Sequence, residues 1–143
     1  MTTKSRRIAE MTQRFQGLGL DARYLAYFEY FNRQQYFEAH DVLEDLWLQD
    51  RQGPNGRFYK GLIQVAGGFV HLQKGRIGPA VAVFDLAERN LAGYGPIHEQ
   101  LDISKLLRLV ADWRRVVARN TTGRVDDRLD WATPHLRLLE VAA

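Results

Sequence analysis

Residues 36–47 read Y-F-E-A-H-D-V-L-E-D-L-W and carry the clearest helical pattern in the chain. Wound at about 100° per residue, they form one apolar face, made of Ala39, Val42, Leu43 and Leu46. Three carboxylates gather on the opposite side, where water is the expected partner: Glu38, Asp41 and Asp45. Along one flank of the apolar face lie His40, Glu44 and Trp47, each about one turn after the last. His40 and Glu44 are therefore predicted to be in hydrogen-bonding reach of each other.

Further helices are predicted on both sides of this one, which ends near residue 49. Asp21 is the expected N-cap of a helix that runs to about residue 33. After the turn at residues 53–56, G-P-N-G, a third helix is predicted over residues 57–74, with Gly75 as its left-handed C-terminal cap. A fourth helix has Pro79 in its first turn and runs to about residue 92. A fifth, capped by Ser104, runs to about residue 119.

No window alternates polar and β-branched residues convincingly, so the fold class is predicted to be all-α. We expect a compact multihelical bundle of antiparallel helix hairpins with five to six helices. A shift of 41 residues aligns Phe28 with Phe69 and Val42 with Val83, which is a weakly tetratricopeptide-like internal repeat. Residues 1–143 are predicted to form a single helical domain, with frayed residues at 1–20. In the tail at 120–143, Thr133-Pro134 either opens a short helix or lies in an extended segment.

Composition excludes several classes of protein. The chain has 143 residues, of which 45% are hydrophobic and 26% charged, so it is neither disordered nor fibrous. It contains no cysteine, which excludes a disulfide scaffold, a thiolate zinc site, an iron–sulfur cluster and a cysteine nucleophile.

Charge and hydropathy bear on partners and location. The net charge of +3 comes from 20 basic and 17 acidic residues spread along the chain, so nucleic-acid binding is not favoured. Its candidate contacts would be Arg114, Arg115 and Arg119. The longest stretch without a charged residue, Gly61–Gln73, is too short and too polar to span a membrane. No signal peptide follows the basic N-terminus, and the expected location is the cytoplasm.

The third predicted helix carries a narrow stripe of small and polar residues: Gly61, Gln64, Gly68 and His71. Glycine inside a helix costs about 1 kcal/mol relative to alanine, so it indicates a place where another backbone or a ligand comes close. If this stripe faces the second helix, Gln64 and His71 would converge with His40 and Glu44 on one polar site.

The same residues resemble a known family. The patterns F-N-x-x-x-Y-F-E-A-H-D-x-L-E-x-x-W, G-L-I-Q-x-A and H-L-x-x-G, within about residues 22–94, are similar to the family called domain of unknown function 309. The residues that match its motifs are Glu38, His40, Glu44, Trp47, Gly61, Gln64 and His71. The resemblance implies a small multihelical fold and carries no established activity.

Two hypotheses of function follow. In the first, the protein is a structural or binding module, its polar residues fix the packing of the helices, and its partner is a protein or small molecule. In the second, it is a small metal-assisted or acid/base hydrolase that uses Glu44, His40, Gln64 and His71. The candidate catalytic residues are Glu44, His40 and His71, and the candidate binding residues are Glu38, Gln64 and Trp47. No cofactor is expected under the first hypothesis.

The second hypothesis allows a divalent metal held by His40, Glu44 and His71. The spacing of His40 and Glu44 alone is weak support, since histidine and glutamate four residues apart occur by chance in many helices. A homodimer is plausible for so small a chain, although no motif specifies one.

Overall fold

The computed structural model describes residues 2–119 and 134–139, and these form an all-α fold. The helices are α1 (Thr3–Thr12), α2 (Ala22–Asn32), α3 (Tyr36–Gln49), α4 (Gly56–Gln73), α5 (Ile77–Leu91) and α6 (Ile103–Ala118). Two short 3₁₀ segments, Gln13–Phe15 and Ala92–Tyr94, follow α1 and α5. Two two-residue strands, β1 (Ile97–His98) and β2 (Leu101–Asp102), lie between α5 and α6. The prediction of an all-α bundle with five to six helices is confirmed.

Local chemistry explains most of the helix ends. The Asp21 carboxylate accepts a hydrogen bond from the backbone N–H of Arg23, which caps α2 as the sequence predicts. Gly75 has a φ of 70° just after α4, a conformation that glycine adopts without steric cost. At α6 the predicted cap was wrong: Asp102, not Ser104, accepts from the N–H of Lys105 at 2.9 Å. The helix therefore begins two residues earlier than expected.

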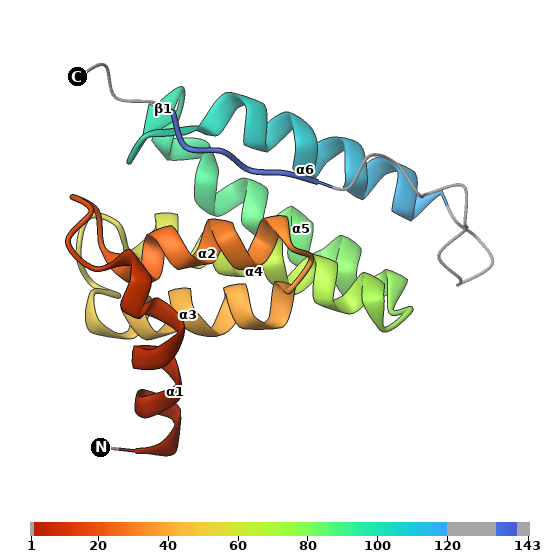
Figure 1. Ribbon diagram of the computed structural model, residues 1–143. Helices are drawn as coiled ribbons and strands as arrows, with labels where there is room; N and C mark the ends of the chain where they lie inside the picture. Colours follow the sequence, from red (N-terminus) through yellow and green to blue (C-terminus); the bar gives the residue numbers. More distant parts are fainter. Residues whose placement is uncertain (1, 120–133, 140–143) are drawn as a thin grey trace.

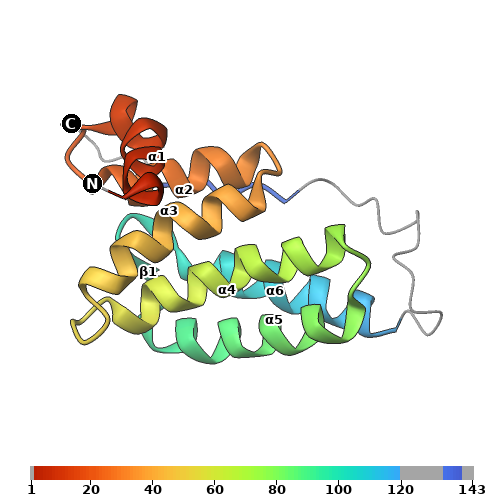
Figure 2. The same cartoon turned by 90° about the horizontal axis from the view of Figure 1, so that it is seen from below.

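Successive helices from α2 to α6 pack each on the next, and they form two antiparallel hairpins followed by a fifth helix (Figures 1 and 2). The hairpins α2–α3 and α4–α5 are the two halves of the 41-residue repeat. Helix α1 runs across this row and packs against α2 and α3 (Figure 1). No helix among the described residues is long and apolar enough to cross a membrane.

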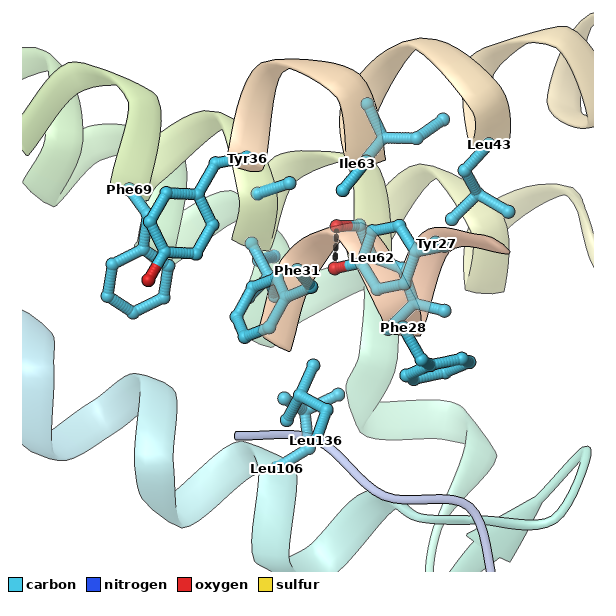
Figure 3. Close-up of a cluster of buried hydrophobic side chains, with 14 of the residues drawn as sticks. Tyr27, Phe28, Phe31, Tyr36, Leu43, Leu62, Ile63, Phe69, Leu106 and Leu136 are labelled. Atoms are coloured by element: carbon cyan, nitrogen blue, oxygen red, sulfur yellow. Dashed lines mark hydrogen bonds between the residues drawn. The ribbon is translucent and has the colours of Figure 1, made fainter. Parts of the chain in front are cut away.

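Helix α4 is the centre of the core. The Tyr27 hydroxyl of α2 donates a hydrogen bond to the backbone carbonyl of Leu62 in α4 at 2.7 Å (Figure 3). The Phe69 ring of α4 meets Phe31 of α2 and Trp113 of α6 edge-on, with ring centres 5.6 and 5.2 Å apart. Because α4 also packs on α3 and α5, it is surrounded by four helices.

The β1–β2 hairpin was not predicted. It pairs Ile97 with Asp102 and His98 with Leu101, around a turn in which Glu99 and Gln100 have φ values of 47° and 61°. Turns of this kind usually carry Asn-Gly or Asp-Gly, which are the residues that sequence analysis recognises. Glu-Gln gives no such signal, so the hairpin was invisible in the sequence.

Residues 134–139 run in an extended conformation between α2 and α6 (Figure 1). Of the two alternatives for Thr133-Pro134, the extended one holds for 134–139, whereas residues 120–133 lie outside the described part. Pro134 and Leu136 are buried and Leu138 is half-buried, while His135, Arg137 and Leu139 are exposed. We call residues 134–139 the tail and the space between α2 and α6 that holds it the tail groove.

Candidate functional site

The two side chains predicted to pair on α3 are neighbours, but they lie slightly beyond hydrogen-bonding distance. His40 Nε2 lies 3.8 Å from Glu44 Oε2, and both side chains are about one-third exposed. The Lys4 ammonium of α1 lies 3.4 Å from the other carboxylate oxygen of Glu44. Glu44 therefore lies between a histidine of its own helix and a lysine of the helix that crosses it.

The carboxylate of Asp41 lies in a different environment from the one predicted. It is only 7% exposed, and the Arg7 guanidinium of α1 forms an ion pair with it. His40 Nδ1 is 3.5 Å from the second oxygen of Asp41, and this buried nitrogen makes no hydrogen bond within the described residues. The expectation that Asp41 faces water was wrong because α1, which the sequence shows as polar and weakly patterned, packs over that side of α3.

The remaining acidic residues of α3 are less buried. Asp45 accepts a hydrogen bond from Arg23 at 2.9 Å, and Glu38 is half-buried in the first turn of α3. Arg23 also binds Asp21, and this hydrogen bonding lowers the pKa of the Asp21 carboxyl in spite of partial burial, which acts in the opposite direction.

The glycine stripe of α4 faces α5. A Cβ atom added to Gly61 would lie 2.6 Å from Leu91 Cγ, and one added to Gly68 would lie 2.3 Å from Phe84 Cε1. The side-chain oxygen of Gln64 accepts a hydrogen bond from Asn90 Nδ2 at 2.7 Å. All three partners belong to α5, so the predicted convergence of Gln64 with His40 and Glu44 was wrong.

His71 is half-buried near the end of α4, and its Nδ1 is buried without a hydrogen bond to the described residues. Within residues 2–119 and 134–139, no group of three or more histidine, aspartate and glutamate side chains is placed to hold a metal ion. His40, Glu44 and His71 are thus not brought together as a ligand set. Under the hydrolase hypothesis only the His40–Glu44 contact remains.

Trp47, the last of the predicted binding residues, has a local role. The Lys60 ammonium lies 4.5 Å from the centre of its ring and the Arg51 guanidinium 5.9 Å from it. The cation–π contact with Lys60 joins α3 to α4, while Arg51 belongs to the turn that links them. Trp47 is half-buried and leaves part of its ring to solvent.

The tail groove contains a contact that the sequence analysis missed. Asn32 Nδ2 donates to the backbone carbonyl of Leu136, and Asn32 Oδ1 accepts from the backbone N–H of the same residue, both at 2.8 Å. Further along, the N–H of Leu139 donates to the carbonyl of Gln100 at 2.6 Å. The tail is therefore bound through its main chain at two points, from α2 and from the β1–β2 turn.

The side chain of Leu136 completes this binding. It is 5% exposed and lies in the same buried cluster as Phe28 and Phe31 of α2 and Leu106 of α6 (Figure 3). One signal for this site was present in the sequence, because Pro134, Leu136 and Leu138 occupy alternate positions, as in a half-buried extended segment. Asn32 is the second residue of the family pattern, and nothing in its spacing shows that it binds a segment more than 100 residues away.

A second polar cluster lies at the end of the bundle near the β1–β2 turn. His98 Nε2 is 2.7 Å from Asn55 Oδ1, and the Tyr24 hydroxyl donates to the Glu99 carbonyl at 2.7 Å. Burial, with the nearby Glu99 carboxylate, raises the pKa of Tyr24. These contacts fix the turn that holds Leu139, so they support the tail groove.

Comparison with known proteins adds one finding. Residues 24–83 match the family model described as "Domain of unknown function (DUF309)", which confirms the resemblance over most of α2, all of α3 and α4, and the first part of α5. No curated protein and no solved structure matches the chain.

Proposed function

We propose that this protein is a small helical binding module whose tail groove binds an extended peptide segment of a partner, in competition with the chain's own tail. The observation that carries the proposal is the pair of hydrogen bonds between the Asn32 side chain and the main chain of Leu136.

These two bonds recognise backbone rather than side chain. One primary amide satisfies both the N–H and the C=O of a single residue, as a neighbouring strand does in a β-ladder. Any L-residue other than proline offers the same two groups in the same places when it is extended. Asn32 is therefore suited to bind a segment whose sequence differs from that of the tail.

Side-chain selectivity comes from the alternation along the tail. Positions 134, 136 and 138 point toward the protein to different degrees, and positions 135, 137 and 139 are exposed. Extended peptides are commonly recognised in this way, with main-chain hydrogen bonds for affinity and pockets for alternate side chains. A partner segment with apolar residues at every second position meets both requirements, and it needs neither a metal nor a cofactor.

The tail of the same chain competes for this groove. A partner peptide binds with an apparent Kd equal to its intrinsic Kd divided by the fraction of molecules whose groove is free. Releasing the tail should therefore tighten binding without altering the groove. Leu136→Glu should release the tail from the groove, since an unpaired carboxylate is not retained at a 5% exposed site.

The test uses a fluorescein-labelled peptide with the sequence of residues 133–139, T-P-H-L-R-L-L, and fluorescence anisotropy. We expect it to bind the Leu136→Glu protein at least tenfold more tightly than the wild type. Adding Asn32→Ala should abolish that binding, whereas Gln35→Ala, at an exposed position three residues away, should not change it.

A peptide methylated on the backbone nitrogen that corresponds to Leu136 loses the N–H that Asn32 accepts, so it should bind at least tenfold more weakly than the parent peptide. The proposal fails if no peptide binds the Leu136→Glu protein while its circular dichroism shows an intact helical fold. It also fails if Asn32→Ala leaves the affinity unchanged.

A further inference from the structure

We infer that the tail groove is built for a partner peptide with a ring-sized apolar side chain, larger than leucine, at the position that Leu136 occupies in the tail. This inference rests on the proposed function and names the chemical class of its ligand.

A cavity of about 150 Å³ lies between the tail and α6. Three leucines give it an apolar wall, namely Leu101 of β2 and Leu106 and Leu109 of α6, and the tail contributes Leu136. Leu101 and Leu106 are 2% and 1% exposed, so the wall belongs to the rigid core rather than to the surface. The space is thus next to Leu136, which is itself only 5% exposed.

Its volume is large for a gap in a folded protein. Protein interiors are close-packed, and voids larger than a water molecule are few. A closed apolar cavity of about this volume is known to accept benzene, so this space is large enough for a ring, although it is partly open to solvent and Asp102, Lys105, His135 and Arg137 also line it. The leucine of the tail therefore leaves room beside it for a larger side chain.

Four polar residues line the cavity, of which Lys105, His135 and Arg137 are exposed to solvent and Asp102 is already engaged within the fold. Asp102 Oδ1 accepts the N–H of Lys105 at 2.9 Å, because it caps α6. A ligand group that enters the cavity meets mainly the leucine wall, and an apolar ring satisfies that wall better than a charged or amide side chain does. Phenylalanine is the simplest residue that combines a ring with an extended backbone.

It follows that a partner peptide can displace the tail from the tail groove. Its main chain makes the hydrogen bonds that any extended segment would make, while its side chain at position 136 makes fewer contacts than the site allows. A partner peptide with a ring at that position gains the missing contacts and displaces the tail, which otherwise keeps the groove covered.

The experiment compares four labelled peptides based on T-P-H-L-R-L-L: the parent, one with phenylalanine in place of Leu136, one with alanine there, and one with phenylalanine in place of Leu138. Each is titrated into both the Leu136→Glu protein and the wild type. The ratio of two Kd values does not depend on the tail, because the fraction of free groove is common to both peptides. The wild type therefore provides the same readout if Leu136→Glu perturbs the fold.

We expect phenylalanine at position 136 to tighten binding at least fivefold over the parent and alanine to weaken it at least tenfold. Phenylalanine at 138, a half-buried position that does not line the cavity, should change the affinity less than twofold. In Leu109→Trp, which fills the cavity from the side of α6, the advantage of phenylalanine at 136 should disappear while the parent peptide still binds.

The outcomes separate this inference from the proposal beneath it. If the parent peptide binds and phenylalanine at 136 gives no gain, the ring pocket is overturned and the peptide groove stands. The ring pocket is also overturned if the gain persists in Leu109→Trp. If none of the peptides binds either protein, the groove itself is refuted.

Discussion

Replacing Gly67 and Gly68 of α4 by alanine, one at a time, tests whether the glycine stripe allows the close approach of α5. At Gly68 the added methyl carbon would lie 2.3, 2.6 and 2.7 Å from three atoms of the Phe84 ring. At Gly67 the nearest atom would be Val83 Cγ1 at 3.8 Å, an ordinary van der Waals contact. The two sites lie in the same helix and undergo the same chemical change, so each is the control for the other.

The expected magnitude follows from two opposing effects. In a helix interior, alanine is more favourable than glycine by about 1 kcal/mol, and this gain applies at both sites. At Gly68 the methyl group displaces a ring that is 0% exposed, and such overpacking costs about 1–3 kcal/mol. Gly67→Ala should therefore stabilise the protein. Gly68→Ala should be less stable than Gly67→Ala by about 1–3 kcal/mol, because the helix-propensity gain cancels in the comparison.

Urea unfolding followed by circular dichroism measures both free energies, with an unchanged slope as the sign that compactness is preserved. A second variant, Phe84→Leu, removes the atoms that clash. The loss caused by Gly68→Ala should be at least 1 kcal/mol smaller in the Phe84→Leu background, since residues in contact are energetically coupled. The close approach of α4 and α5 would be refuted if Gly68→Ala stabilised the protein as much as Gly67→Ala does.

Three further predictions concern the tail, the α1–α3 contact and alkaline pH. Asn32→Ala removes two hydrogen bonds and should lower the free energy of unfolding by about 1–3 kcal/mol. In the double variant with Leu136→Ala the loss should be smaller than the sum of the two separate losses, because either change releases the same tail, and full additivity would contradict the contact. Hydrogen exchange of residues 134–139 gives an independent readout. Arg7→Ala leaves the buried Asp41 without its cation and should lower the unfolding free energy by about 1–3 kcal/mol, whereas Arg6→Ala, at an exposed neighbour, should have little effect. Burial raises the pKa of Tyr36 to about 12, so the stability that its neutral form contributes is complete below pH 10 and is lost as the pH rises from 10 towards 12. Urea unfolding at pH 8, 10 and 11 should show a fall in the free energy of unfolding, and this fall should be smaller in Tyr36→Phe.

The positions of the helices were accessible from the sequence because each helix carries its own signals. The predicted range 36–49 coincides with α3, and the prediction 57–74 starts and ends within one residue of α4. The helix predicted to follow a cap at Ser104 and to end near residue 119 starts within two residues of α6 and ends within one. The 3.6-residue period and the residues at the ends act within a single element, so they need no knowledge of its neighbours.

The sequence did not show which helix each face of a helix would contact. Helix α4 contacts α2, α3, α5 and α6, so apolar and small residues occur on nearly all its sides, and periodicity cannot say which side meets which helix. The polar site required the stripe of Gly61, Gln64 and Gly68 to face α3, and this stripe faces α5 instead. The predicted polar site failed for that reason, although its local part, the contact between His40 and Glu44, was present.

Contacts distant in the sequence were beyond prediction for a second reason. Helix α1 has only Ile8 and Thr12 buried, so its pattern did not show that it would cover Asp41. Asn32 and Leu136 are 104 positions apart, and one asparagine in a helix and one leucine in a tail carry no mark of their partnership. Both contacts are made by short segments whose burial depends on the rest of the fold being in place.

The residues of the tail groove lie partly inside and partly outside the segment that matches the family, so related chains can test the proposal. Asn32 and the aromatic residues of α2 fall within residues 24–83, the part that matches the family, whereas Leu101, Leu106, Leu109 and the tail lie outside it. If the proposal is correct, backbone recognition resides in the shared part and the choice of side chain in the part beyond it. A relative that has asparagine at the position of Asn32 but different residues in α6 should bind extended peptides with a different preference at position 136. Exchanging the α6 segments of two such chains should exchange their preferences and leave the effect of Asn32→Ala in both. Loss of all binding in both exchanged but folded chains would show instead that main-chain recognition depends on α6 as much as on α2.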